Sequence, residues 1–205
     1  MNDNIKNSIK LFADYEKAFD WEQAISIFNR IYSEIDYHTK LNLTNRLLFL
    51  ISDSLIELQN TEEQYNKGSE FLLELSQKAR IQFKEEADFW FCLGICGISA
   101  YFLLEMKSDD EVDEIFKSVY EKMPENLLYK AWYFCDSVAK YNYDNSFKRE
   151  ILKEAFSNNT LPQWEKDNGL IGFYVVEFLR DVKKELDDAL LTGDRDIVIR
   201  YIGQN

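Results

Sequence analysis

The sequence has very few of the residues that reverse a chain or carry out chemistry. Its 205 residues include only 2 prolines, 7 glycines, 3 cysteines and 1 histidine. A β-rich protein must turn often and uses glycine and proline to do so, so this scarcity disfavours a β fold. Hydrophobic residues make up 46% and aromatic residues 15%, which is enough for a continuous core. These proportions predict a folded, all-α protein.

The shortage of histidine limits the enzymes that this chain can be. His38 is the only imidazole, whereas zinc sites and carboxylate-histidine di-iron sites usually need more imidazole, or several cysteines close together. Gly94 and Gly97 lie within an apolar helical stretch and do not form a glycine-rich phosphate loop. A dyad of Cys135 and His38 stays open, although no spacing favours it. We therefore predict no enzymatic activity, no cofactor and no metal site.

The cysteines and the longest apolar segment bear on cellular location. Cys92, Cys96 and Cys135 lie in apolar helical stretches, and we expect them to pack as small apolar groups without forming a disulfide framework. This favours a reducing cytoplasm. The N-terminus is polar, so no signal peptide is expected. Phe89–Leu104 has sixteen residues, fewer than the roughly 20 that a bilayer requires, and is predicted to be a buried core helix rather than a membrane segment.

Apolar residues recur at intervals of three and four along most of the chain, which is the period of an amphipathic helix. The segment Phe89–Leu104 is apolar almost all round, and a one-faced helix follows it after the polar run Lys107–Asp110. Two helices joined in this way form an αα-hairpin. Asp20, Thr61 and Asn126 stand at expected helix starts, where their side chains can cap free backbone N–H groups.

The whole chain is predicted to contain roughly ten helices in about five antiparallel hairpins. The expected elements are a hairpin over residues 4–37, helices over 39–59 and 61–83, the hairpin over 86–124, helices carrying 128–139 and 147–156, a long helix carrying 170–191 and a short one carrying 197–202. Tyr141–Ser146 is predicted as a turn and Ser157–Pro162 as the most loop-like stretch. Residues 1–205 are assigned to one α-helical domain, with a looser C-terminal part from about residue 160 as an open alternative.

Some of these segments resemble the tetratricopeptide repeat. The segment Phe19–Phe28 is similar to the start of the repeat's second helix. Trp90, Leu93 and Gly94 are similar to the signature of its first helix. Phe116 and Pro124 match the closing half of the repeat. Gly97 and Val112 depart from the pattern, which has tyrosine and alanine there. The resemblance implies that Gly94 lets two helices approach closely and that Phe116 fills the gap between adjacent hairpins. Other helical bundles remain possible.

The charge balance is strongly acidic. The chain has 24 Lys and Arg residues against 37 Asp and Glu residues, a formal net charge of −13. Such a surface repels nucleic acid and anionic lipid and attracts basic proteins. The densest basic stretch, which contains Lys78, Arg80 and Lys84, is followed at once by Glu85 and Glu86. We expect no nucleic-acid and no membrane partner, with simple solubility as the alternative reason for the charge.

Two clusters of acidic residues are the candidate partner-binding residues. The first lies at a helix start and the second along a later helix: Asp109, Asp110, Glu111, Asp113 and Glu114, and then Asp181, Glu185, Asp187 and Asp188. Part of the first cluster is expected to be structural, because a helix N-terminus stabilises negative charge. The remaining repulsion costs stability, which is tolerable where a basic partner neutralises it.

The chain is similar in overall character to the immunity proteins of bacterial contact-dependent growth-inhibition and other polymorphic toxin systems. The similarity lies in small size, acidity, helical content and richness in asparagine, isoleucine and lysine. It implies a protein that binds a cognate basic toxin domain, such as a nuclease, and covers its active-site cleft. The alternative is a tetratricopeptide-like adaptor or regulator that holds a peptide in a concave groove. The partner's identity, the binding face and the oligomeric state stay open.

Overall fold

The computed structural model describes residues 3–136 and 144–192, and within these ranges it is all-helical, as the composition predicts. The elements are α1 (Asp3–Lys17), α2 (Trp21–Ile31), α3 (Tyr37–Glu57), α4 (Glu62–Gln82), α5 (Ala87–Ala100), a 3-10 helix η1 (Tyr101–Leu104), α6 (Asp109–Lys122), α7 (Leu127–Cys135), α8 (Asn145–Ser157), α9 (Thr160–Asp167) and α10 (Gly169–Thr192). The described ranges contain no β-strand. A single cluster of buried apolar side chains includes residues from every one of these helices.

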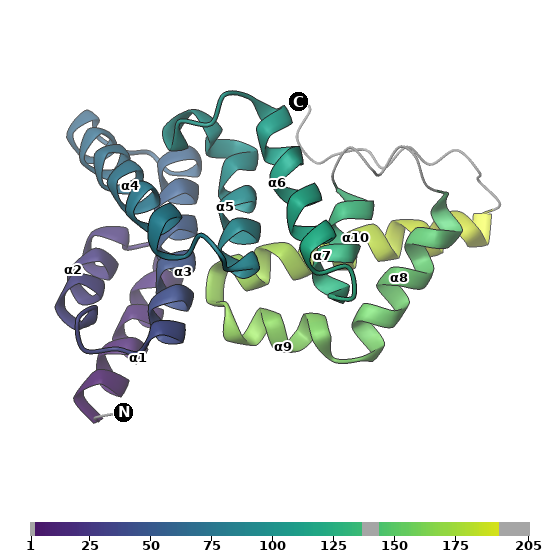
Figure 1. Ribbon diagram of the computed structural model, residues 1–205, viewed down its shortest axis with the longest axis horizontal. Helices are drawn as coiled ribbons and strands as arrows, with labels where there is room; N and C mark the ends of the chain where they lie inside the picture. The colour runs from purple at the N-terminus through teal and green to yellow at the C-terminus, as the bar shows by residue number, and fades with distance from the viewer. Residues whose placement is uncertain (1–2, 137–143, 193–205) are drawn as a thin grey trace.

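Most helices that follow one another in the chain contact one another in space. The contacts include α1 with α2, α3 with α4, α5 with α6, α7 with α8, and α9 with α10, and α3 also contacts α5. The last described helix, α10, then returns to contact α1, α3 and α7 (Figure 1). In a linear array of helical repeats each unit contacts only its neighbours. The return of α10 to the first helices of the chain is therefore a feature that the sequence pattern did not predict.

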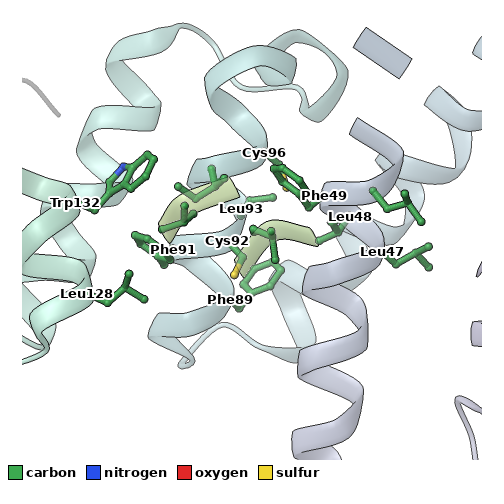
Figure 2. Close-up of a cluster of buried hydrophobic side chains, with 14 of the residues drawn as sticks. Leu47, Leu48, Phe49, Phe89, Phe91, Cys92, Leu93, Cys96, Leu128 and Trp132 are labelled. Atoms are coloured by element: carbon green, nitrogen blue, oxygen red, sulfur yellow. The ribbon is translucent and has the colours of Figure 1, made fainter. Parts of the chain in front are cut away.

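The central helix α5 is apolar all round because it is packed between neighbours. Figure 2 shows its side chains between those of α3, including Leu47 and Leu48, and those of α7, including Leu128 and Trp132. Burying a large apolar side chain of this kind stabilises the fold by about 1.5 to 3 kcal/mol. Within the described ranges, Ala87–Leu104 is the one segment long and apolar enough to cross a membrane, and 61% of it is buried inside the protein. Core helices pass the same test.

The predicted helix Phe89–Leu104 does not continue to its expected end. The α-helix stops at Ala100, and Tyr101–Leu104 forms a 3-10 turn. The backbone N–H of Met106 donates to the carbonyl oxygen of Tyr101 at 3.0 Å, and Glu105 takes a left-handed conformation with φ 54°. The tighter turn and the left-handed residue reverse the chain toward α6, which periodicity alone does not reveal.

The three predicted helix caps are confirmed. The Asp20 carboxylate accepts a hydrogen bond from the backbone N–H of Gln23 at 3.1 Å, at the start of α2. Thr61 and Gln64 form a reciprocal capping box at the start of α4. The Asn126 side chain accepts from two backbone N–H groups in the first turn of α7. These caps depend on local geometry only, which is why the sequence predicts them well.

The predicted loop Ser157–Pro162 is confirmed only at Asn158 and Asn159 and is wrong at its other positions. Helix α8 ends at Ser157 and α9 begins at Thr160, so only Asn158 and Asn159 separate the two helices. Asn159 has a φ of 56°, the left-handed conformation that asparagine tolerates better than most residues. Pro162 lies in the first turn of α9, where a missing N–H breaks no helical hydrogen bond. Polar composition therefore indicated a loop where a helix starts.

Two further predictions fall partly or wholly outside the described residues. In the predicted turn Tyr141–Ser146, residues 141–143 lie outside them, whereas Asp144 caps α8 by accepting from the backbone N–H of Phe147 at 2.8 Å. Asn145 and Ser146 already belong to α8. The predicted terminal helix over residues 197–202 also lies outside the described ranges.

Candidate functional site

The single histidine is exposed and the three cysteines are buried. His38 is exposed in the first turn of α3, and its ring stacks edge-on against Tyr37 with centroids 5.9 Å apart. Burial raises the pKa of the Cys96 and Cys135 thiols to about 12 and that of Cys92 well above its usual value. A protonated, buried thiol is a poor nucleophile. No three His, Cys, Asp or Glu residues of the described ranges are placed to hold a metal ion.

The predicted cluster at the start of α6 is partly engaged in the structure of the protein. The carboxylate of Glu111 accepts from the backbone N–H of Lys107 at 2.8 Å, which closes the turn before the helix. Glu114 lies 3.6 Å from Lys117. Both glutamates also line a cavity of about 330 Å³ beside Trp90, and Lys84 and Lys122 line the same cavity. The charge at this place is therefore mixed, and of the remaining members Asp109 and Asp110 are exposed and Asp113 is half-buried.

The four predicted residues of α10 divide between two sides of that helix. Residues seven apart on an α-helix lie about 20° apart around its axis, and residues eleven apart lie equally close. Asp181, Glu185 and Asp188 therefore share one side of α10 with Tyr174, which is 41% exposed. Asp187 lies on another side, where its carboxylate accepts a hydrogen bond from Lys183 at 2.6 Å.

Three carboxylates that the sequence pattern does not single out lie near Tyr174. Burial raises the pKa of Tyr174 to about 12, and the negative charges of Asp136, Asp53 and Glu57 add to the rise. Asp53 and Glu57 come from α3, Asp136 follows α7, and Tyr174 stands on α10. The ring of Tyr174 packs on Phe49 with centroids 5.3 Å apart. Helix packing thus brings together charges that are far apart in the sequence.

Asp53 is held in an unfavourable electrostatic environment. Burial, and in second place the charge of Glu57, raises the pKa of Asp53 from 3.8 to about 6. Among the described residues, neither Asp53 nor Glu57 lies within ion-pair distance of a lysine or arginine. Desolvated like charges without a cation reduce stability, and such perturbed groups gather at functional sites more often than elsewhere.

These residues form one candidate binding surface, the acidic stripe, which consists of Asp53, Glu57, Asp136, Tyr174, Asp181, Glu185 and Asp188. Its part on α10 is about 21 Å long, because the rise of an α-helix is about 1.5 Å per residue. The start of α6 lies apart from the far half of α10 (Figure 1). The structure therefore does not join the two predicted clusters, but it extends the second one with residues from α3 and α7.

One signal in the sequence points to Asp53. Helix α3 is apolar over most of its length, and Asp53 lies between the buried residues Ser52 and Ser54 and within one turn of the buried Leu50. An acidic residue within a helix whose neighbours are buried is a candidate for a perturbed pKa. Glu57 and Asp136 show no comparable signal, because each stands at or just beyond a helix end, where charged residues are ordinary.

No protein-family model, no curated protein and no solved structure matches the chain.

Proposed function

We propose that this chain binds a basic protein through the acidic stripe and neutralises it, in the manner of an immunity protein acting on a cognate toxin domain. The observation that carries the proposal is the pair Asp53 and Glu57, two close carboxylates without a cation among the described residues. A lysine or arginine side chain of a partner would supply the missing positive charge. Binding would then recover the stability that the unpaired charges cost the free protein.

The chemistry of the stripe fits a nucleic-acid-cleaving toxin domain. A nuclease cleft presents lysine and arginine side chains to phosphates. The carboxylates of Asp181, Glu185 and Asp188, spaced along about 10 Å of α10, would occupy positions that phosphates otherwise take. The net charge of −13 would speed the encounter with such a cleft, and Tyr174 would supply an aromatic contact within the charged surface. The proposal includes a cytoplasmic location, which the three free cysteines support.

The proposal includes a tetratricopeptide-like arrangement of the helices. Two contacts support it. A Cβ atom added to Gly94 would lie 2.8 Å from the ring of Phe116, so the glycine permits the close approach of α5 and α6. Phe116 in turn contacts both Phe91 of α5 and Trp132 of α7, with ring centroids 5.9 and 5.8 Å away. It therefore fills the space between consecutive helix pairs.

The position of α10 favours a neutralising protein over a peptide-binding adaptor. An adaptor of the tetratricopeptide kind would hold its peptide against the first helices of the pairs. In this chain α10 itself contacts α1, α3 and α7, the first helices of three pairs. A peptide would have to share that face with α10, whereas a folded basic domain can bind the exposed side of α10 directly.

The proposal is tested by capture of the natural partner. The tagged protein is used to isolate partners from its native host, and each captured protein is identified and expressed. We expect a basic protein that arrests growth when expressed alone and is harmless when co-expressed with this chain. The pair should bind at nanomolar affinity, with an association rate that falls as salt rises.

A charge-matched pair of variants locates the binding surface. The stripe variant combines Asp53→Asn, Glu57→Gln, Asp181→Asn and Glu185→Gln, and the control combines Glu70→Gln, Glu121→Gln, Glu125→Gln and Glu154→Gln, all exposed and outside the stripe. We expect the stripe variant to weaken the complex at least about 100-fold, because close interfacial charge pairs contribute about 1.5 kcal/mol or more each. Equal weakening by both variants would show that only the net charge of the protein matters for binding. In the capture experiment, an acidic or harmless partner would refute the proposal.

A further inference from the structure

A cavity of about 650 Å³ lies where α1, α3, α9 and α10 meet, and no residue of the acidic stripe lines it. Its volume falls within the range of small-molecule sites in proteins. The charged side chains that line it are Glu16, Lys17, Arg46, Glu165 and Lys166, and its apolar walls are formed by Ala13, Pro162, Leu170 and Phe173. Four separate helices contribute to it, so the cavity exists only in the folded chain.

The two acidic side chains of this cavity are already paired. Glu16 receives two hydrogen bonds from Arg46 and a third, at 3.1 Å, from the backbone N–H of Leu170. Glu165 lies 3.2 Å from Arg180 of α10. Lys17 and Lys166 have no ion-pair partner within the described ranges.

The cavity is therefore a positively charged place on a protein of net charge −13. Each of the two lysines lies in the last turn of a helix, where a positive charge stabilises the helix. That stabilisation explains why each helix has a lysine in its last turn. It does not account for their meeting at one cavity, since either could satisfy its helix end while facing bulk solvent.

Phe173 gives the cavity an exposed aromatic wall. Its side chain is 55% exposed, although large aromatic side chains are usually more deeply buried. An aromatic ring of a ligand can stack on it and recover the apolar burial that the free protein lacks. Cations on the rim and a ring on the wall together select a ligand with a negative charge at one end and an apolar body.

We propose that this cavity binds a small organic anion, a phosphate or carboxylate group carried on an aromatic ring. The anionic group lies between Lys17 and Lys166, and the ring lies against Phe173. The site does not depend on the acidic stripe or on any protein partner, so its test is separate from that of the proposed function.

The test uses four simple probes on the purified full chain: phenyl phosphate, benzoate, inorganic phosphate and phenol. Binding is followed by chemical shifts of backbone amides and by calorimetry at constant ionic strength. We expect saturable binding of the two aromatic anions with dissociation constants of about 1 mM, which is typical for ligands of this size. Inorganic phosphate and phenol, which each lack one half of the ligand, should bind at least about tenfold more weakly. Shifts should concentrate on α1, α9 and the start of α10.

Two variants and a control decide where the probes bind. Lys17→Gln with Lys166→Gln should weaken phenyl phosphate at least about tenfold, and Phe173→Ser should weaken it about as much while leaving inorganic phosphate unchanged. The control, Lys10→Gln with Lys107→Gln, removes the same charge from exposed positions outside the cavity and should change nothing. The proposal is overturned if the aromatic anions do not saturate, if inorganic phosphate binds as tightly as phenyl phosphate, or if the control and cavity variants behave alike.

Discussion

Arg46 of α3 donates two hydrogen bonds to Glu16 of α1 inside the protein, from Nε to Oε1 at 3.1 Å and from Nη2 to Oε2 at 2.5 Å. The Glu16 and Arg46 side chains are only 2% and 10% exposed. Glu16 also accepts from the backbone N–H of Leu170, so one carboxylate connects α1, α3 and the start of α10. Gly169 has a φ of 56°, and a Cβ atom there would lie 2.4 Å from this carboxylate. The junction therefore requires glycine at that position.

Removing one member of this pair should destabilise the protein strongly. Arg46→Met leaves the Glu16 carboxylate buried without a counter-charge, and we expect the free energy of unfolding to fall by about 3 to 5 kcal/mol. Urea denaturation followed by circular dichroism measures it. The double variant Glu16→Leu/Arg46→Met should be more stable than Arg46→Met alone, because no buried charge remains. A loss below about 1 kcal/mol in the single variant would mean that the pair is solvated.

The close approach of α5 and α6 predicts the effect of a single methyl group at Gly94. Alanine is the better helix former by about 1 kcal/mol, but the added carbon would lie 2.8 Å from the ring of Phe116. That ring is buried and cannot move freely, so we expect Gly94→Ala to destabilise the protein by about 1 to 2 kcal/mol net. Adding Phe116→Leu to Gly94→Ala should restore part of the lost stability, because the smaller side chain leaves room for the added methyl group. Stabilisation by Gly94→Ala, measured by thermal unfolding, would contradict the packing.

The environment of Asp53 predicts a pH dependence of stability. Its pKa is raised from 3.8 to about 6, so between about pH 4 and pH 6 the folded protein holds a proton that the unfolded chain releases. This contribution to stability is fully present below about pH 4 and is lost as the pH rises through 6. Asp53→Asn should therefore stabilise the protein at pH 7.5 and have little effect at pH 4, where Asp53 is already protonated in the folded protein. The expected gain at pH 7.5 is about 1 to 2 kcal/mol, because the side chain is partly exposed and solvent screens its charge.

The control for Asp53 is Glu121→Gln, which removes one negative charge from an exposed position on α6. Its effect on the free energy of unfolding should be within about 0.5 kcal/mol at both pH values. Chemical denaturation of both variants from pH 4 to pH 7.5, at constant ionic strength, measures the two free energies of unfolding. An Asp53→Asn effect that is equal at the two pH values would exclude a raised pKa in the folded state.

The three thiols should be unreactive until the protein unfolds. Cys92, Cys96 and Cys135 are free and buried, and burial raises the pKa of each thiol. Only the thiolate attacks disulfide reagents. At pH 8 a chromogenic disulfide reagent should therefore label the native protein no faster than it unfolds, and should label all three thiols at once in guanidinium chloride. Rapid labelling of one native thiol would show an opening that the packing does not contain.

Much of the local structure could be predicted because its causes are local. The spacing of apolar residues gives the helices, and Asp20, Thr61 and Asn126 give their starts, since a capping side chain bonds to N–H groups within three residues of it. The errors are local as well. The left-handed residues Glu105 and Asn159 redirect the chain, the first just after the expected end of the helix Phe89–Leu104 and the second within the stretch expected to be a loop.

The candidate site was only half predictable. Asp181, Glu185 and Asp188 are visible in the sequence because the period of the helix places them on one side of α10. Asp53 and Asp136 join them only because α10 crosses α3 and α7, and no periodicity connects positions that far apart. The raised pKa of Asp53 likewise depends on burial, which is a property of the packed chain.

The amino-acid sequence by itself determined the helical class, the positions of most helix starts, the apolar character of the central helix and the negative charge of the whole chain, because these depend on residue type and short-range spacing. The tertiary structure alone decided that α10 folds back onto α1 and α3, which carboxylates gather at Tyr174, and where two lysines meet an exposed aromatic ring. Contacts between distant segments depend on how whole helices pack, and the energy of a charge depends on what that packing places around it.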